Sequence, residues 1–334
     1  MFSLSRIRRR QFITLLGGVA IAVPWRVAAQ SPSRVYRVGL FNRGAPIADA
    51  SGYGKALIRG LEKRGYVLGR NLEFERRGAG GRFDLLPSLL DELVASKVDV
   101  VVAFGYPAAF TAKTRAKLPA VIFQTGDPVG TGLVDNLARP TANLTGVSDM
   151  AIELAPKRLQ LLKELVPGLR RVAIIWNAAD AGMVLHYQTS DAAAQALGIA
   201  IQPFGVREPD DIDRAFEAMT RDKPDALLVI AEALTVSNRS RIYDFGTVNR
   251  IPVLYEENGF LIRDGGVMYY GPDDGEMMDR VAALVDRILK GVKPQDLPFE
   301  QPTLFKFMIN AKTTTALGLE IPPAMRLLAD EVIE

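Results

Sequence analysis

Polar and aromatic side chains recur where short apolar runs of this 334-residue sequence end. Arg43 follows the run VGLFN, and its guanidinium has the planar fork of donors that matches a carboxylate. Tyr106 follows VDVVVAFG, where a phenol can stack on a flat ring and donate a hydrogen bond. These residue types favour binding of a small molecule. The candidates are Asn42, Arg43, Tyr53, Gly105, Tyr106, Pro107, Thr125, Asp127, Asn177, Glu232, Tyr255 and Glu256.

Several of these residues also have an explanation that needs no ligand. Arg43 stands beside glycine and could be a solvated side chain, and Tyr106 could be a surface residue in a tight turn. Asp127 either receives a positively charged ligand group or caps the backbone after it as an Asx turn. Trp176 is either a ring of the core or a lid over the ligand. The sequence leaves these alternatives open.

Catalytic and metal chemistry have few residues to draw on. The chain has no cysteine, which excludes disulfides, thiolate catalysis and cysteine-zinc sites. His186 is the only histidine, so a Ser-His-Asp triad could form only around it. We expect His186 to be structural or to lie at the rim of the site. An enzyme that uses acids such as Asp127 and Glu232 is the less favoured alternative, and we expect no catalytic residue, no metal and no cofactor.

The segments that carry these candidates recur in a second copy later in the chain. Runs of β-forming residues alternate with helical stretches, which predicts parallel βαβ units. RVGLFN at 37–42 recurs as RVAIIWN at 171–177, VDVVVAFGY at 98–106 as PDALLVIAE at 224–232, and LPAVIFQTGD at 118–127 as IPVLYEENGF at 251–260. The offset between the copies is nearly constant. The pattern predicts an α/β protein with two similar Rossmann-like (flavodoxin-like) lobes.

This duplication also predicts where the candidates meet. An open parallel sheet binds ligands outside the carboxyl ends of its strands. Two lobes that face one another would form a cleft between these ends. We therefore expect the loops after equivalent strands, including those of Glu232 and Tyr106, to lie on opposite walls of one cleft.

Residues 1–30 have the layout of an export signal. The string RRRQFI precedes an apolar run that ends at Val23, and the small residues VAA follow at 27–29. The apolar run is shorter than the roughly 20 residues that span a bilayer, although an uncleaved membrane anchor is the alternative. The string is similar to a twin-arginine signal. We expect a soluble, exported protein of the periplasm without a lipid anchor, because no cysteine follows the leader.

Charge and length narrow the class of protein further. The formal net charge is +3, but residues 1–30 contain five arginines and no acidic residue. Without them, 36 basic residues stand against 38 acidic ones, which gives no electrostatic case for nucleic acid. The remaining length, roughly 300 residues, exceeds what one core organises comfortably. We expect two domains and a monomer.

Four stretches resemble a known family. They are GLEKRGYVLGRNLEFERR, VDVVVAFGYPAA, LPAVIFQTGDPVGTGLVDNLARPTANLTGVS and the tail from ILKGVKPQDLPF to the end. They are similar to tryptophan- and tyrosine-binding-like solute-binding proteins of ABC importers. The resemblance implies a type I periplasmic-binding fold, with a three-strand hinge whose crossings lie near 146–153, 266–272 and 298–303. It divides the chain into an N-terminal lobe of residues 31–148 and 270–298 and a C-terminal lobe of residues 149–269 and 299–334.

The resemblance also implies a function. Such a receptor closes over a small molecule and delivers it to an ABC permease in the inner membrane. We expect a small polar or aromatic metabolite, with amino acids among the candidates. Tyr106 stands where the family often has a small hydroxyl residue, and Glu232 stands where it often has Asp. A sensor that presents its closed form to a receptor kinase is the alternative, because both functions use the same cleft.

Overall fold

The computed structural model describes residues 34–115, 117–140, 143–256 and 261–334. The predicted export signal, residues 1–30, lies outside the described residues. Residues Val35–Glu334 form one compact unit. In the described part of the chain, no helix has both the length and the apolar composition needed to cross a membrane.

The first lobe is built on a five-stranded sheet in which neighbouring strands run parallel. Along β1, Val38 and Leu40 face one core cluster while Phe41 faces the other, as the two-residue period of a strand requires. Helices cover both faces: α1 (Gly52–Glu62) and α9 (Asp274–Leu289) on one, α2 (Leu86–Ala95) and α3 (Tyr106–Arg115) on the other. In order across the sheet, the strands are β2 (Leu72–Gly78), β1 (Tyr36–Asn42), β3 (Val100–Phe104), β4 (Ala120–Phe123) and β5 (Leu144–Val147).

The second lobe repeats this plan with a four-stranded parallel sheet. Its strands, in order across the sheet, are β7 (Ala200–Val206), β6 (Arg171–Asn177), β8 (Ala226–Val229) and β9 (Val253–Tyr255). On one face pack α4 (Ala151–Leu165) and α5 (Ala181–Ala196), and on the other α6 (Pro209–Arg221) and α8 (Arg239–Asn249), while the short α7 (Ala233–Ser237) follows β8.

A smaller sheet completes the second lobe. Met268, Phe307 and Ile309 join the same core cluster as α4 and β6, which assigns this sheet to the second lobe. Three 3₁₀ turns, Phe83–Leu85, Leu261–Asp264 and Pro294–Asp296, lie in connecting loops. The sheet is β10 (Met268–Pro272), β11 (Phe305–Asn310) and β12 (Glu331–Ile333), with α10 (Ala311–Ala316) and α11 (Pro323–Leu328) after β11.

The two large sheets share one strand order. The first begins β2-β1-β3-β4 and the second is β7-β6-β8-β9, so the first four strands across the first sheet each have a counterpart in the second, while β5 is an addition to the first. Equivalent strands also pair in equivalent register, since Val38 lies opposite Val100 and Val172 lies opposite Ala226. This order is the flavodoxin-like form of the doubly wound fold. The predicted pair of similar Rossmann-like lobes is confirmed.

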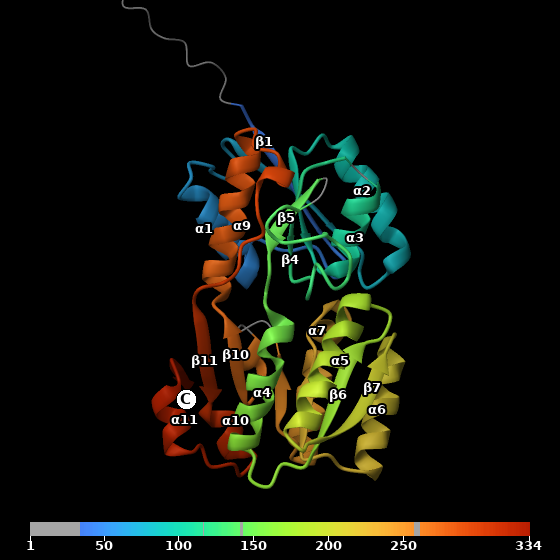
Figure 1. The fold of residues 1–334 in the computed structure, drawn as a ribbon, viewed down its shortest axis with the longest axis vertical. Helices are drawn as coiled ribbons and strands as arrows, with labels where there is room; N and C mark the ends of the chain where they lie inside the picture. The colour runs from blue at the N-terminus through green and yellow to red at the C-terminus, as the bar shows by residue number, and fades with distance from the viewer. Residues whose placement is uncertain (1–33, 116, 141–142, 257–260) are drawn as a thin grey trace, which may run out of the picture. The chain divides into compact units, whose positions relative to one another are not determined.

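Helix α9 shows how a late segment of the chain joins the first lobe. Its buried residues, among them Met277, Val281 and Leu284, fall on one stripe, as their spacing predicts, and they join the core around β1 and β3. Figure 1 shows α9 beside α1, although the two helices lie far apart in the sequence. A methyl group on Gly60 would lie 2.7 Å from the Cβ of Ala282, so glycine permits this close packing.

Three connections join the lobes. The chain passes from β5 to α4 through residues 148–150, returns between β10 and α9, and passes again between α9 and β11. The first and third connections pair with each other, because the Ser148 amide donates to the Glu300 carbonyl at 2.9 Å and the Glu300 amide donates to the Gly146 carbonyl at 2.9 Å. The lobe boundaries drawn from the sequence stay predictions.

Candidate functional site

A cavity of about 810 Å³ lies where strands of both large sheets end. The loops after β1, β3 and β4 line it from the first lobe, and the loops after β6, β7 and β8 line it from the second. Its position agrees with the rule that parallel sheets bind ligands outside their carboxyl ends. The lining residues that carry the argument below are Arg43, Tyr53, Phe104, Tyr106, Asp180 and Glu232.

Arg43 is held rigidly at the end of β1. Its Nε donates to the Gly81 carbonyl at 2.9 Å, and its guanidinium lies 3.9 Å from the centre of the Phe83 ring. Only 5% of the side chain is exposed. The residues that follow β2 therefore fix the direction of the guanidinium toward the second lobe.

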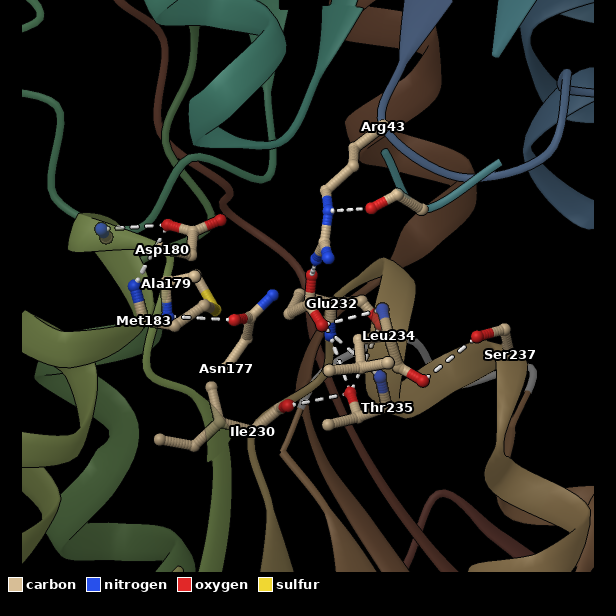
Figure 2. Close-up of polar contacts among 12 residues, drawn as sticks. Arg43, Asn177, Ala179, Asp180, Met183, Ile230, Glu232, Leu234, Thr235 and Ser237 are labelled. Carbon is tan, nitrogen blue, oxygen red and sulfur yellow. Dashed lines mark hydrogen bonds and ion pairs between the residues drawn. The ribbon is translucent and has the colours of Figure 1, made fainter. Parts of the chain in front are cut away.

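Glu232 follows β8 and meets Arg43 from the second lobe. Its Oε1 caps α7 by accepting from the amides of Leu234, at 2.6 Å, and Thr235, at 3.3 Å. Its Oε2 accepts from Nη1 of Arg43 at 2.7 Å, and 9% of the side chain is exposed (Figure 2). The Glu232 carboxylate thus caps the N-terminus of a helix in the second lobe and neutralises a buried cation of the first lobe. Removing either partner would leave the other charge buried and unpaired, which is costly.

Asp180 places a second carboxyl group, beside that of Glu232, in the part of the cavity wall that the second lobe contributes. It is the N-cap of α5, and its Oδ1 accepts from the amides of Gly182, at 2.9 Å, and Met183, at 3.3 Å (Figure 2). The side chain is 3% exposed. Burial raises the pKa of Asp180 to about 7, and the negative charge of Glu232 adds to this effect. Asp180 is therefore close to half ionised at neutral pH.

Aromatic rings form the first-lobe wall. Tyr53 and Phe104 lie 6.1 Å apart between ring centres, and both line the cavity with Tyr106. The Tyr53 hydroxyl accepts from Nε2 of Gln124 at 2.5 Å and donates to Asp274 at 3.2 Å. Burial raises the pKa of the Tyr106 phenol, with a contribution from Asp180, so the phenol keeps its proton at neutral pH. The wall can stack on a flat ligand and offer it polar groups.

The lobes also approach closely at the start of α5. A Cβ atom built on Gly182 would lie 3.2 Å from the carbonyl oxygen of Thr125 and 3.2 Å from the Cβ of Tyr106, both in the first lobe. This separation is tighter than ordinary van der Waals contact. A larger residue at position 182 would push the two surfaces apart.

The structure brings seven of the twelve candidate residues together around the cavity: Asn42, Arg43, Tyr53, Gly105, Tyr106, Pro107 and Glu232. Six of them follow the ends of β1, β3 and β8, and Tyr53 lies in the first turn of α1. Whether each one contacts a ligand stays a prediction.

The other five candidates lie outside the cavity lining. Thr125 is 1% exposed. Asp127 accepts from the Val129 amide at 2.9 Å, which is the Asx turn that the sequence left as an alternative. Asn177 lies behind the lining and its Oδ1 accepts from the Ala179 amide at 2.9 Å, while its Nδ2 is buried without a partner among the described residues. Tyr255 packs in the core of the second lobe and donates to the Thr235 carbonyl at 3.2 Å.

Glu256, the fifth of these, belongs to a buried polar cluster. Its Oε2 lies 2.6 Å from Nε2 of His186, and its Oε1 accepts from Ser190 at 3.3 Å. Both Glu256 and His186 are fully buried. Burial alone would raise the pKa of Glu256, but His186 holds it below its usual value. His186 is therefore structural rather than part of the cavity wall.

Trp176 is a ring of the core rather than a lid. It stacks on Tyr187 with ring centres 3.7 Å apart and planes 5° from parallel, and it belongs to the main core cluster of the second lobe. Its neighbour Asn177 turns to the opposite face of β6.

Sequence reasoning missed Asp180. Its signal is present, because an aspartate directly before the apolar helical stretch AGMVL is a helix N-cap, and helix N-termini point at the cleft in this fold. Met183, which also lines the cavity, carries no comparable signal. In the described part of the chain, no group of three or more His, Cys, Asp or Glu residues is arranged to hold a metal ion.

Two flavodoxin-like lobes, three connections and a cavity at the facing strand ends define the type I periplasmic-binding fold. The profile of the family described as ABC transporter substrate binding protein matches residues 50–333. The chain therefore belongs to this family, and the resemblance found in its sequence is confirmed.

Individual relatives agree with this assignment. A tyrosine-binding protein of Clostridioides difficile is 25% identical over 280 residues, which cover 83% of this chain and 78% of the relative. A solved ABC domain from Streptococcus pneumonia, in complex with L-Trp, superposes with a TM-score of 0.82 at 24% identity and covers 90% of this chain and all of that one. A conserved domain protein of Vibrio cholerae gives the same TM-score, identity and coverage. The two structures show the shared fold.

Proposed function

We propose that this protein is the extracytoplasmic receptor of an ABC importer, which binds a small polar or aromatic metabolite between its lobes and delivers it to a membrane permease. The observation that carries this proposal is the 810 Å³ cavity whose walls come from both lobes and are bridged by the Arg43–Glu232 ion pair. A ligand in this cavity would contact both lobes at once. Membership in the substrate-binding family supports the same function.

The mechanism follows from where the contacts lie. Contacts to Tyr53 and Tyr106 come from the first lobe, and contacts to Asp180 and Glu232 come from the second. A ligand can make both sets only when the lobes are close together, so binding shifts the population toward the closed form. The three connections between the lobes serve as the hinge, and the permease reads the closed form.

The cavity suits a compact ligand with a flat ring. Its volume lies within the range of small-molecule sites, and the rings of Tyr53, Phe104 and Tyr106 provide apolar, stackable surface. A micromolar affinity corresponds to about 8 kcal/mol, which one ring stack and a few hydrogen bonds can supply. Binding requires no catalytic group, and the one histidine lies buried against Glu256.

A thermal-shift screen of the purified protein tests the proposal. The compounds should include amino acids, aromatic acids and amines, purines and pyrimidines. A ligand at 100 times its dissociation constant should add about 2.7 kcal/mol of stability. Tyr106→Ala should weaken that ligand, while Thr114→Ala, at an exposed position of the same helix, should not. A screen without any stabilising compound, or a ligand insensitive to Tyr106→Ala, would contradict the proposed site.

Uptake separates an importer from a sensor. Cells that lack this protein should lose high-affinity uptake of the ligand found in the screen and regain it when the gene is restored. Fractionation of the restored cells should recover the protein from the periplasm. Unchanged uptake would favour the sensor, because a sensor alters transcription or motility without carrying its ligand.

A further inference from the structure

The Asp180 carboxyl group is only half satisfied. Its Oδ1 accepts two backbone hydrogen bonds, whereas its Oδ2 has no hydrogen-bond partner among the described residues. The side chain is 3% exposed, and this residue lines the cavity. A carboxylate this deeply buried, with one oxygen unpartnered, is costly to ionise unless a positive charge lies beside it; otherwise it holds a proton. The cavity next to Oδ2 is where a ligand can supply that charge.

The surrounding charges compensate the Asp180 carboxylate only in part. Glu232 faces Asp180 from the end of β8 and is negative, while Tyr106 faces it from α3 and is neutral. Arg43 is the buried cation nearest to both acids, but its charge is neutralised by Glu232 at 2.7 Å. With both acids ionised, this cluster of three side chains carries a net charge of about −1.

The same contacts already engage the buried cation of the lining. Arg43 is the one buried arginine among the described residues of the lining, and it already donates to Glu232 and to the Gly81 carbonyl. Arg82 pairs with Asp84 at 2.7 Å, and Arg239 pairs with Asp264 at 2.7 Å, both in partly exposed positions. Arg207, the remaining arginine of the lining, is exposed to solvent. A carboxylate at the cavity floor would lie beside two acids, which is unfavourable.

We infer that the ligand presents a positively charged nitrogen to Oδ2 of Asp180, and that the cleft takes an aromatic amine rather than an amino acid. This inference rests on the proposed function of the cavity as a ligand site. The rings of Tyr53, Phe104 and Tyr106 receive the flat part of the ligand, because they line the same cavity. Aromatic faces also attract cations, which adds to the preference.

Four indole compounds test the charge preference on one ring. Tryptamine is a cation, tryptophan a zwitterion, tryptophol neutral and indole-3-acetate an anion near neutral pH. Dissociation constants should be measured by calorimetry with the full chain at pH 5 and pH 8. Tryptamine should bind most tightly at pH 8. At pH 5 Asp180 is protonated, so tryptamine should bind on the order of 100-fold more weakly, given that the pKa of Asp180 is about 7.

Two matched variants complete the test. Asp180→Asn keeps an oxygen for the two backbone hydrogen bonds but removes the charge, so it should lose tight tryptamine binding and the dependence on pH. Asp127→Asn is the control, because Asp127 forms an Asx turn outside the cavity lining and Asn preserves that turn. This control should bind tryptamine as the unaltered protein does.

The outcomes separate this inference from the proposed function. Tighter binding of tryptophan or indole-3-acetate than of tryptamine would overturn the inference and leave the receptor function in place. Tryptamine binding that is unchanged in Asp180→Asn, or equal at pH 5 and pH 8, would also overturn it. Failure of tryptamine to bind at all would overturn it as well, whereas the receptor function fails only if the broad compound screen finds nothing.

Discussion

The ion pair between Arg43 and Glu232 should stabilise the closed arrangement of the lobes even without a ligand. Its two side chains are 5% and 9% exposed and belong to different lobes. Arg43→Met keeps the bulk over the Phe83 ring and removes the charge. Glu232→Gln keeps an oxygen that can cap α7 and also removes the charge. These two substitutions and their combination form a double-mutant cycle.

The structure sets the expected magnitude. Two unit charges about 4 Å apart attract by about 4 kcal/mol at an effective dielectric constant of 20. Loss of hydration offsets part of this attraction, so we expect a coupling of about 1–3 kcal/mol. A coupling of that size changes the ratio of closed to open molecules by about 5- to 150-fold. The single variants should open the cleft rather than unfold the chain, because opening returns the unpaired charge to water.

Two measurements check this prediction. Urea unfolding of the four proteins gives the coupling free energy, and small-angle scattering without ligand gives the change in radius of gyration as the lobes open. The exposed pair Arg37–Glu73, with an N–O distance of 3.0 Å and side chains 45% and 48% exposed, is the control cycle. Its coupling should be below about 1 kcal/mol. A coupling at Arg43–Glu232 no larger than this, together with unchanged scattering, would refute the reasoning.

Three further predictions concern the second lobe. Gly182→Val should separate the lobes and weaken ligand binding at least tenfold, whereas Ala181→Val, at the exposed neighbouring position, should not. Equal ligand affinities of the two variants in calorimetry would contradict a close contact between the lobes at Gly182. The pKa of Asp180 is raised to about 7, so between about pH 4 and pH 7 the folded protein holds a proton that the unfolded chain has released. This group therefore makes the free energy of unfolding fall as the pH rises from about 4 to 7. Asp180→Asn should therefore raise the free energy of unfolding at pH 8 by up to about 4 kcal/mol, and a variant no more stable than the original at pH 8 in urea would count against the buried charge. His186→Gln should lower the free energy of unfolding by about 3–5 kcal/mol because it removes the positive charge that Glu256 faces, and a loss below 1 kcal/mol would show that hydrogen bonds alone satisfy this buried carboxylate.

Much of the fold could be predicted from the sequence because its determinants are local. Buried parallel strands appear as short apolar runs such as VDVVVAF and RVAIIWN, and their repetition reveals two lobes of one design. The apolar stripe of α9 also predicted a core-facing helix, and its buried residues pack in the core of the first lobe, where Gly60 meets Ala282. The strand ends supplied most of the cavity wall for the same reason.

Side-chain direction at these strand ends could not be predicted with the same success. Arg43 and Glu232 face the cavity, whereas Asp127 turns back onto its own loop and Tyr255 points into the core of the second lobe. One residue of difference in where a strand ends moves a side chain to the other face of the sheet. Asp180 was missed because its importance depends on burial beside Glu232, and burial is not a property of either segment alone.

Two similar α/β lobes, with polar residues after their strands, follow from the amino-acid pattern alone. Which of those residues share a site depends on how the folded lobes are placed. Arg43 and Glu232 are 189 positions apart, and their contact depends on how two independently organised lobes approach one another. The electrostatics of the site follow from the same approach, since the cost of an unpaired charge appears only when the second lobe excludes water from it.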